Sequence, residues 1–456
     1  MKGRADVNIR PADGVFQTGS PKSGDFWGAE TGGRKLFFGQ VCRKTNFRSA
    51  FRRRTLLCLV TGFIWVGAAA QELPSCVHAD KSVLSFPASR AAQDAFYAKL
   101  DSLVATGRGN VNIWHIGGSH VQAAFFPNRI MNLLDSLTLR GDRGFLFPLK
   151  LAGTNYDKSY RITTTGEWEA PILTRATTLR RPRYGITGYG ARTSSADASV
   201  SFQLNPDGDG RWSCQSLRVL GYGSSARAYP YIICLADTLR FEFDDLTRSY
   251  VFDLPAPTDT VMVQFHIPQG EEFVLNGLEP LSWRPGINYF SSGVNGAALP
   301  SWLDKCEDLE RDLRLVCPDL AILAVGINDS ATSSKDFKPE KFKANYRRLL
   351  EMVRRISPDC AFIFITNNDS YRYVRRGMTY NTNAVAVRKA MTELAAEYGA
   401  GVWDLYGIMG GAHSVEKWRD AGLAKADRLH FTDEGYTLLG DLFVQALISD
   451  KEGRNE

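Results

Sequence analysis

A serine, a histidine and an aspartate that lie far apart in the sequence are the residues best suited to chemistry. Ser119 follows two glycines at the end of an apolar run, residues 111–116, whose length suits a buried strand. A serine at a strand-to-helix turn lies at the carboxyl edge of a sheet, with its backbone N–H at a helix N-terminus that stabilises negative charge. Asp427 and His430 share a short loop ahead of a helix expected from about residue 433.

These three residue types form a recognised set for nucleophilic catalysis. A serine hydroxyl is a poor nucleophile near neutral pH and needs an adjacent base. We expect His430 to remove the proton of Ser119 and later to return it to the leaving alcohol. Asp427, three residues earlier on the same loop, would orient the ring and favour its charged form. The set therefore predicts acyl transfer through a serine ester.

Two further segments complete a pattern with the serine and the histidine. Gly-x-Asn-Asp, residues 326–329, follows the apolar run 319–325, and Ser-Gly-Val-Asn-Gly-Ala occupies residues 292–297. In this order the segments resemble the SGNH, or GDSL-type, hydrolases, and in particular the members with Gly-Asp-Ser-His that act as carbohydrate or peptidoglycan O-acetylesterases. The sequence departs from that family at Gly118, where the family usually has aspartate.

The resemblance implies how a negatively charged acyl oxygen would be stabilised. Donors aimed at that oxygen would be the backbone N–H of Ser119, the backbone N–H of Gly296 and the side-chain amide of Asn328. His120 and Asp329, adjacent to these residues in sequence, are candidates to line the pocket. The family works without a cofactor, and the sequence has no grouped histidine and carboxylate ligands that would predict a metal site.

The fold expected from this resemblance is the three-layer α/β fold of the SGNH hydrolases, with a flavodoxin-like parallel sheet and an inserted all-β, jelly-roll-like domain. We expect the hydrolase domain in two parts, residues 77–154 and 285–450. Between them, residues 155–284 contain short strand-like runs separated by turns, which predict a β-sandwich that could bind carbohydrate. Helices are expected from Val121 onward and over residues 88–106, 299–316, 339–356 and 381–398, with a loop over residues 367–379.

Two features of the insert suggest further expectations. Five of its aromatic residues could stack on sugar rings, although core packing is the alternative for each: Trp168, Tyr184, Tyr189, Trp212 and Tyr222. Cys214 and Cys234 could form a disulfide in an exported protein, and buried free thiols are the alternative.

Residues 1–70 have the character of a leader. Arg52–Arg54 precede an apolar stretch of about 15 residues that ends in three alanines, which predicts a secretory signal peptide cut after Ala70. The segment upstream of about Phe51 is unusually long for such a leader and suggests a start site assigned too early. We therefore expect an exported protein, periplasmic or extracellular. Lipid anchoring at Cys76 is the less favoured alternative, because Pro74 fits a lipoprotein box poorly.

The charge distribution limits the partners. The chain has a formal net charge of +6, but residues 1–54 hold 12 Lys/Arg against 4 Asp/Glu, so the remainder is close to neutral. Nucleic acid is therefore not an expected partner, and an acylated glycan or peptidoglycan is. The stretch that ends at Ala70 is short for a membrane span, and the sequence does not indicate an oligomeric state.

Three other functions compete with ester hydrolysis. An O-acyltransferase would use the same triad and deliver the acyl group to a sugar hydroxyl, and an inactive carbohydrate-binding protein could keep the scaffold. An α/β-hydrolase is disfavoured because Val121 replaces the second glycine of Gly-x-Ser-x-Gly. The sequence leaves open which glycan and which acyl group would be the substrate.

Overall fold

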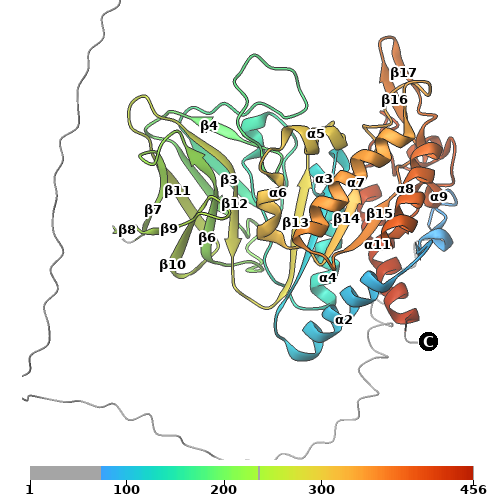
Figure 1. Cartoon of the computed structure of the whole chain (residues 1–456), viewed down its shortest axis with the longest axis horizontal. Helices are drawn as coiled ribbons and strands as arrows, with labels where there is room; N and C mark the ends of the chain where they lie inside the picture. Colours follow the sequence, from blue (N-terminus) through green and yellow to red (C-terminus); the bar gives the residue numbers. More distant parts are fainter. Residues whose placement is uncertain (1–72, 235–236, 455–456) are drawn as a thin grey trace, which may run out of the picture. The chain divides into compact units, whose positions relative to one another are not determined.

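A six-stranded sheet forms the centre of the computed structural model, which describes residues 73–234 and 237–454 (Figure 1). Its strand order is β1-β18-β15-β14-β2-β13, and only the short edge strand β1 runs antiparallel to its neighbour. The expected signal peptide lies outside the described residues. The strands are β1 (Leu84–Ser85), β2 (Asn110–Gly117), β13 (Gly286–Gly293), β14 (Leu320–Ala324), β15 (Ala361–Ile365) and β18 (Gly401–Trp403).

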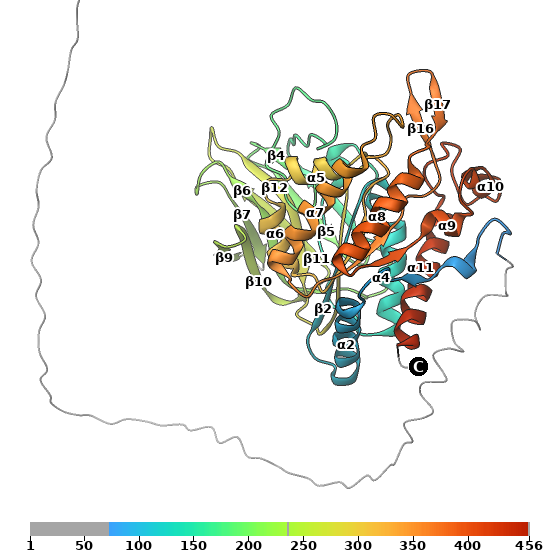
Figure 2. The ribbon, with the colours of Figure 1, turned by 45° about the vertical axis from the view of Figure 1, so that its right-hand side comes forward.

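Helices cover both faces of this sheet, because the central strands are apolar on both sides. On one face α2 (Ala91–Thr106) lies with α4 (Phe125–Leu137) and α11 (Asp433–Gly453), and α4 and α11 pack side by side (Figure 2). The other face is covered by α5 (Leu299–Lys305), α6 (Leu309–Val316), α7 (Pro339–Ile356) and α8 (Ala384–Tyr398). Short helices complete the fold: η1 (Ala79–Lys81), α3 (Ser119–Gln122), η2 (Leu149–Ala152), α9 (Leu405–Met409) and α10 (Ser414–Asp420).

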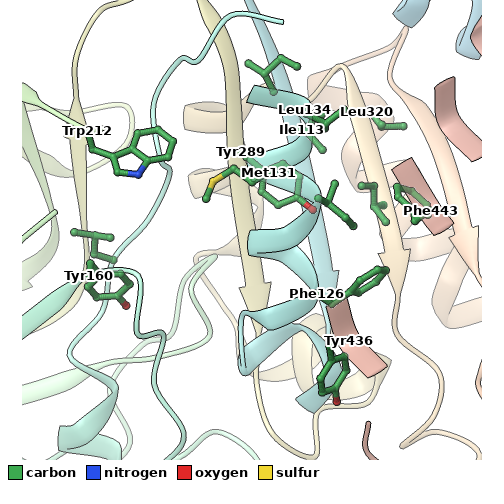
Figure 3. Packing of buried hydrophobic residues seen from close by; sticks show 14 of the residues in the cluster. Ile113, Phe126, Met131, Leu134, Tyr160, Trp212, Tyr289, Leu320, Tyr436 and Phe443 are labelled. Carbon is green, nitrogen blue, oxygen red and sulfur yellow. The ribbon is translucent and has the colours of Figure 1, made fainter. Parts of the chain in front are cut away.

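Alternating strand residues supply the two apolar cores. Ile113 and Leu320 join the core beneath α2, α4 and α11, together with Phe126 and Phe443 (Figure 3). Their sequence neighbours point the other way, and Trp114 belongs to the core beneath α5–α8. This two-sided packing confirms the predicted three-layer α/β fold with a parallel sheet. It also fixes the register of the strands that end at the candidate site.

Residues between β2 and β13 form two antiparallel five-stranded sheets. One has the order β4-β12-β6-β10-β9 and the other β3-β5-β11-β7-β8. All of these strands lie within the expected insert, residues 155–284. Their bounds are β3 (Arg161–Thr165), β4 (Ala191–Thr193), β5 (Ser199–Gln203), β6 (Cys214–Gly223), β7 (Tyr229–Cys234), β8 (Asp237–Leu239), β9 (Phe241–Asp244), β10 (Ser249–Thr258), β11 (Thr260–His266) and β12 (Phe273–Leu281).

Three local predictions differ from the structure. The helix after the serine is broken into α3 and α4 by Ala124, whose φ of 63° leaves the helical region. The helix expected over 299–316 is interrupted between α5 and α6. The loop expected over 367–379 contains a β-hairpin, β16 (Tyr371–Val374) paired with β17 (Gly377–Tyr380), whose β-branched and aromatic residues the loop prediction underweighted.

The aromatic residues suggested for sugar stacking mostly lie in the core. Tyr184, Tyr189 and Trp212 are less than a tenth exposed. The partly buried ring of Trp168 packs edge-on against Phe265. The hydroxyl of Tyr222 accepts the backbone N–H of Arg183. Stacking on sugar by the buried rings is therefore wrong as a prediction, because no face of these rings is open to a ligand.

Cys214 and Cys234 are both free cysteines, so the suggested disulfide is absent. Cys214 lies on β6 and Cys234 on β7, and these strands belong to different sheets. The structure therefore agrees with the alternative prediction of free thiols.

Candidate active site

Ser119 is the first residue of α3, directly after β2. Two glycines precede it because neighbouring atoms approach the backbone closely at both positions. A Cβ on Gly117 would lie 2.3 Å from a side-chain methyl of Val121, and one on Gly118 would lie 2.8 Å from Nδ2 of Asn328. The glycine that departs from the family pattern therefore makes room for the amide of a second site residue.

The structure brings the three predicted residues together. Nε2 of His430 lies 2.8 Å from Oγ of Ser119, although 311 positions separate them in the sequence. Nδ1 of the same ring lies 2.7 Å from Oδ2 of Asp427. Oδ1 of Asp427 also accepts the backbone N–H groups of Leu429 and His430, both at 3.0 Å. The carboxylate therefore fixes both the ring and the loop that carries it.

The charge state of Asp427 determines the tautomer of His430. Burial alone would raise the pKa of this carboxyl, but hydrogen bonds from the ring and the backbone of His430 lower the pKa to about 2. An ionised carboxylate can only accept, so Nδ1 carries the proton. Nε2 is then left as the acceptor for the hydroxyl proton of Ser119. This is the arrangement that a general base for a serine requires.

The three candidate oxyanion donors come from adjacent strands. β14, β2 and β13 are neighbours in the sheet, and Gly117 pairs with Gly293 at their carboxyl ends. Within the described residues, the backbone N–H groups of Ser119 and Gly296 make no hydrogen bond and remain available. Asn328 donates one amide hydrogen to the carbonyl of Ala297 at 3.0 Å and has a second to offer.

Asp329 anchors the loop after β14. Its carboxylate accepts the backbone N–H of Leu299 at the start of α5, with both oxygens at 3.1 Å. Burial raises the pKa of this carboxyl to about 6. Asn328 and Asp329 therefore bind the segment that follows Gly296 at two points. The expected pocket role of Asp329 gives way to an anchoring contact in the structure.

His120 lies behind the catalytic ring. Its Nδ1 is 2.8 Å from the hydroxyl of Tyr436, and its ring centroid is 5.4 Å from that of His430. With Thr366 and Phe431 it lines a small cavity. Burial, together with the nearby His430, lowers the pKa of His120 to about 3, so this ring is neutral and adds no charge beside the base.

Gln122 is a site residue that the sequence patterns did not indicate. Its Oε1 accepts the backbone N–H of Asn295 at 2.6 Å, directly before Gly296. Its Nε2 donates to Oγ1 of Thr154 at 2.8 Å and to the carbonyl of Asn155 at 3.0 Å. The only sequence signal is its place one helical turn after Ser119. Gln122 links the helix of the serine to the loop of a candidate oxyanion donor.

Two properties of the described residues bear on metal binding and on membrane insertion. Over residues 73–234 and 237–454, no three histidine, cysteine or carboxylate side chains gather in a way that could hold a metal ion. Within the same ranges no helix has both the length and the apolar character needed to cross a bilayer.

Comparison with known proteins identifies the family of the second hydrolase segment. Residues 279–438 match the model of the GDSL-like lipase/acylhydrolase family. The matched region is similar to that family over about a third of the chain. It includes the Gly-x-Asn-Asp loop, Asp427 and His430, but it begins at residue 279, within the last strand of the insert, and so leaves Ser119 outside. The hydrogen bond between Ser119 and His430 joins the first segment to this acylhydrolase region.

Solved structures extend the likeness beyond the matched region. A structure named for a peptidoglycan O-acetylesterase is 19% identical and has a TM-score of 0.64, covering 80% of this chain and 99% of that chain. This likeness shows that the acylhydrolase and its insert share one known fold. A family two carbohydrate esterase from Cellvibrio japonicus is 11% identical, with a TM-score of 0.28, and covers 64% of this chain and 99% of that one. A GDSL-like lipase from Bacteroides thetaiotaomicron VPI-5482 is 18% identical, with a TM-score of 0.29, and the match covers 36% of this chain and 76% of that chain. No curated protein matches the chain.

Proposed function

We propose that this protein is an exported serine esterase that removes O-acetyl or similar small acyl groups from a carbohydrate. The observation that carries the proposal is the continuous hydrogen-bond chain from Asp427 through His430 to Ser119. Each atom in that chain has the protonation that acyl transfer needs, because an ionised Asp427 leaves Nε2 of His430 free to accept.

The proposed reaction proceeds in two balanced halves. Nε2 of His430 takes the hydroxyl proton as Oγ of Ser119 adds to the ester carbonyl. The negative oxygen of the resulting tetrahedral intermediate is stabilised by the N–H groups of Ser119 and Gly296 and by the amide of Asn328. One such donor is worth about 3 kcal/mol in the transition state. The intermediate collapses to an acyl-serine while the sugar alcohol leaves with the proton from His430.

Water completes the cycle by the same steps in reverse order. His430 removes a proton from water, the hydroxide adds to the acyl carbon, and the ester bond to Ser119 breaks. The proton returns to Oγ of Ser119, and the products are acetate and the free enzyme. A sugar hydroxyl in place of water would give acyl transfer, so analysis of products with and without an acceptor glycan decides between the two outcomes.

Two observations support the choice of substrate class and location. The fold is like that of a structure named for a peptidoglycan O-acetylesterase, which favours an acylated glycan. The basic and apolar leader that ends at Ala70 favours export. N-terminal sequencing of the protein recovered from the cell envelope or medium tests export, with Gln71 expected as the first residue. A mature chain that retains residues upstream of Arg54 would contradict export through this leader.

A chromogenic acetyl ester tests the chemistry. Wild-type protein should hydrolyse p-nitrophenyl acetate, and Ser119→Ala should reduce kcat about 10⁴-fold or more because the nucleophile is gone. Release of acetate from acetylated polysaccharides then identifies the glycan. Equal rates for the wild type and Ser119→Ala would overturn the proposal.

A further inference from the structure

A hollow of about 480 Å³ lies where the inserted domain meets residues 147–151 of the hydrolase domain. The segment after η2, the edge strand β3 and the turn at Pro206–Asp207 form its walls. We call it the insert groove and define it by Tyr156, Lys158, Arg161 and Asp207. A hollow of this size is large enough for several sugar rings. The triad of Ser119, His430 and Asp427 assigns no role to this hollow.

The insert groove carries an excess of positive charge. Lys158 and Arg161 are exposed, and neither forms an ion pair with another described residue. Asp157, which also lines the hollow, is already neutralised by Arg143 at 2.7 Å, with both side chains less than a tenth exposed. Burial opposes ionisation of this aspartate, but the charge of Arg143 and the hydrogen bonds from Ser159 and Arg143 together outweigh it and lower the pKa of Asp157. Asp207 is therefore the only unneutralised acid among the lining residues, which leaves the rim basic.

An exposed aromatic ring lies at the same rim. Tyr156 is 46% exposed, and Nζ of Lys150 lies 4.7 Å from its ring centroid. Unlike the buried tyrosines of the insert, this ring can stack against a ligand. The loop that carries it is held in place from below, because Asn128 on α4 donates to Oδ1 of Asp157 at 2.9 Å. The groove is therefore a preformed surface that combines an aromatic platform with cations.

One hydrogen bond connects the helix of the nucleophile to the segment that leads into the insert groove. Asn155, directly before Tyr156, accepts a hydrogen bond from Nε2 of Gln122 at 3.0 Å. Gln122 follows Ser119 by one turn of α3, a rise of roughly 4.5 Å. A polymer held in the groove would therefore have a neighbouring sugar unit within reach of Ser119.

We propose that the insert groove binds a stretch of glycan that carries carboxylates along its length, next to the unit whose ester is cleaved. This inference rests on the proposed esterase function and names the substrate class: an acylated acidic polysaccharide rather than a neutral one. The carboxylate could belong to a uronic acid or to the lactyl group of a muramic acid that carries no stem peptide. Lys158 and Arg161 would pair with carboxylates while Tyr156 stacks on a ring.

A charge-neutralised variant tests the proposal. Lys158→Gln/Arg161→Gln should lower kcat/KM about tenfold on acetylated polygalacturonate or on O-acetylated peptidoglycan strands from which the stem peptides have been removed, because two exposed ion pairs are lost. Its rate on acetylated glucomannan, a neutral polymer, and on p-nitrophenyl acetate should match the wild type. The preference between the two acidic polymers identifies the source of the carboxylate. Added salt should raise the wild-type KM on the acidic polymer and change that of the variant less.

The matched control removes two exposed cations elsewhere on the insert. The control variant is Arg240→Gln/Arg248→Gln, whose two arginines flank β9. Arg240 directly follows β8, which forms one edge of its sheet, whereas β3 of the insert groove forms the other edge. This control should leave all substrates unaffected. Equal losses in both double variants, an equal loss on the neutral polymer, or no loss on either acidic polymer would overturn the proposal.

A binding measurement separates this inference from the esterase function. Calorimetry with the Ser119→Ala protein and non-acetylated polygalacturonate needs no turnover, and we expect about tenfold weaker binding when Lys158 and Arg161 are also replaced. Absence of any esterase activity in the wild type would overturn the proposed function but not the groove. Equal affinities for polygalacturonate and neutral glucomannan would overturn the groove even if the esterase is active.

Discussion

Asp427 holds His430 through two separate hydrogen bonds, one to the ring and one to the backbone N–H of the same residue. The carboxylate therefore sets both the tautomer of the ring and the shape of the loop that presents it. These two effects can be separated experimentally, because an amide at position 427 can still accept from the backbone but no longer imposes the tautomer.

Asp427→Asn should lower kcat about 10²–10⁴-fold at pH 7 while the protein remains folded, because Nε2 of His430 is no longer held free to accept the proton of Ser119. Steady-state kinetics with p-nitrophenyl acetate measures the loss, and circular dichroism checks the fold. Asp433→Asn, on the neighbouring first turn of α11, serves as the control and should retain activity. A kcat within twofold of the wild type would rule out the assigned role of Asp427.

Asp329→Asn should make stability less dependent on pH. The folded-state pKa of Asp329, about 6, lies above its ordinary value of 3.8, so the wild type loses stability as the pH rises from about 4 through 6. The asparagine can still accept the N–H of Leu299 and carries no charge to bury. We expect the variant to be more stable than the wild type by about 1–2 kcal/mol at pH 8 and equal to it near pH 4.

Urea unfolding at pH 4, 6 and 8 measures this difference. Asp304→Asn is a suitable control, because Asp304 lies on the same helix α5 with its side chain half exposed and paired with Arg348. A variant at position 329 that is less stable than the wild type at pH 8 would show that the charge of Asp329 stabilises the loop.

Gly118→Ala should reduce kcat about tenfold or more with little change in KM. The added Cβ would lie 2.8 Å from Nδ2 of Asn328 and would displace an amide expected to stabilise the oxyanion. Gly453→Ala is the matched control, since a Cβ there meets nothing within 4 Å. Full activity in Gly118→Ala would mean that Asn328 can move without consequence for the reaction.

Gln122→Leu should lower kcat about tenfold and reduce the free energy of unfolding by about 1–3 kcal/mol, because it leaves the partly buried N–H of Asn295 without its acceptor. The activity loss follows from the new freedom of the adjacent Gly296. Stopped-flow or steady-state assays give kcat, and denaturant titration gives stability.

Thr154→Val provides the discriminating comparison. It removes one acceptor of Gln122 and of the side-chain amide of Asn295 but keeps the bond from the backbone N–H of Asn295 to Oε1, so stability should fall while kcat stays within about threefold of the wild type. Equal losses of kcat in the two variants would show that Gln122 has a purely structural role.

The sequence by itself determined the layers of the fold and the identity of the reacting groups. Predominantly apolar runs such as residues 111–116 and 319–325 predict buried strands because a sheet covered on both faces buries the side chains on both sides of its central strands. The periodic segment 339–356 predicts its helix to the residue, as α7 confirms. Ser119 and His430 were predicted because four short motifs, each local in the sequence, occur in the order that resembles the SGNH hydrolases.

Only the tertiary structure decided how these loops are joined. The contacts of Gln122 with Asn295, and of Gly118 with Asn328, cross from one strand end to the next, and no local pattern records such distances. The aromatic residues of the insert show the same limit, because sequence alone could not separate the buried Tyr189 from the exposed Tyr156. Burial and hydrogen-bond partners depend on which distant segments pack together, and that is settled only when the whole chain is folded.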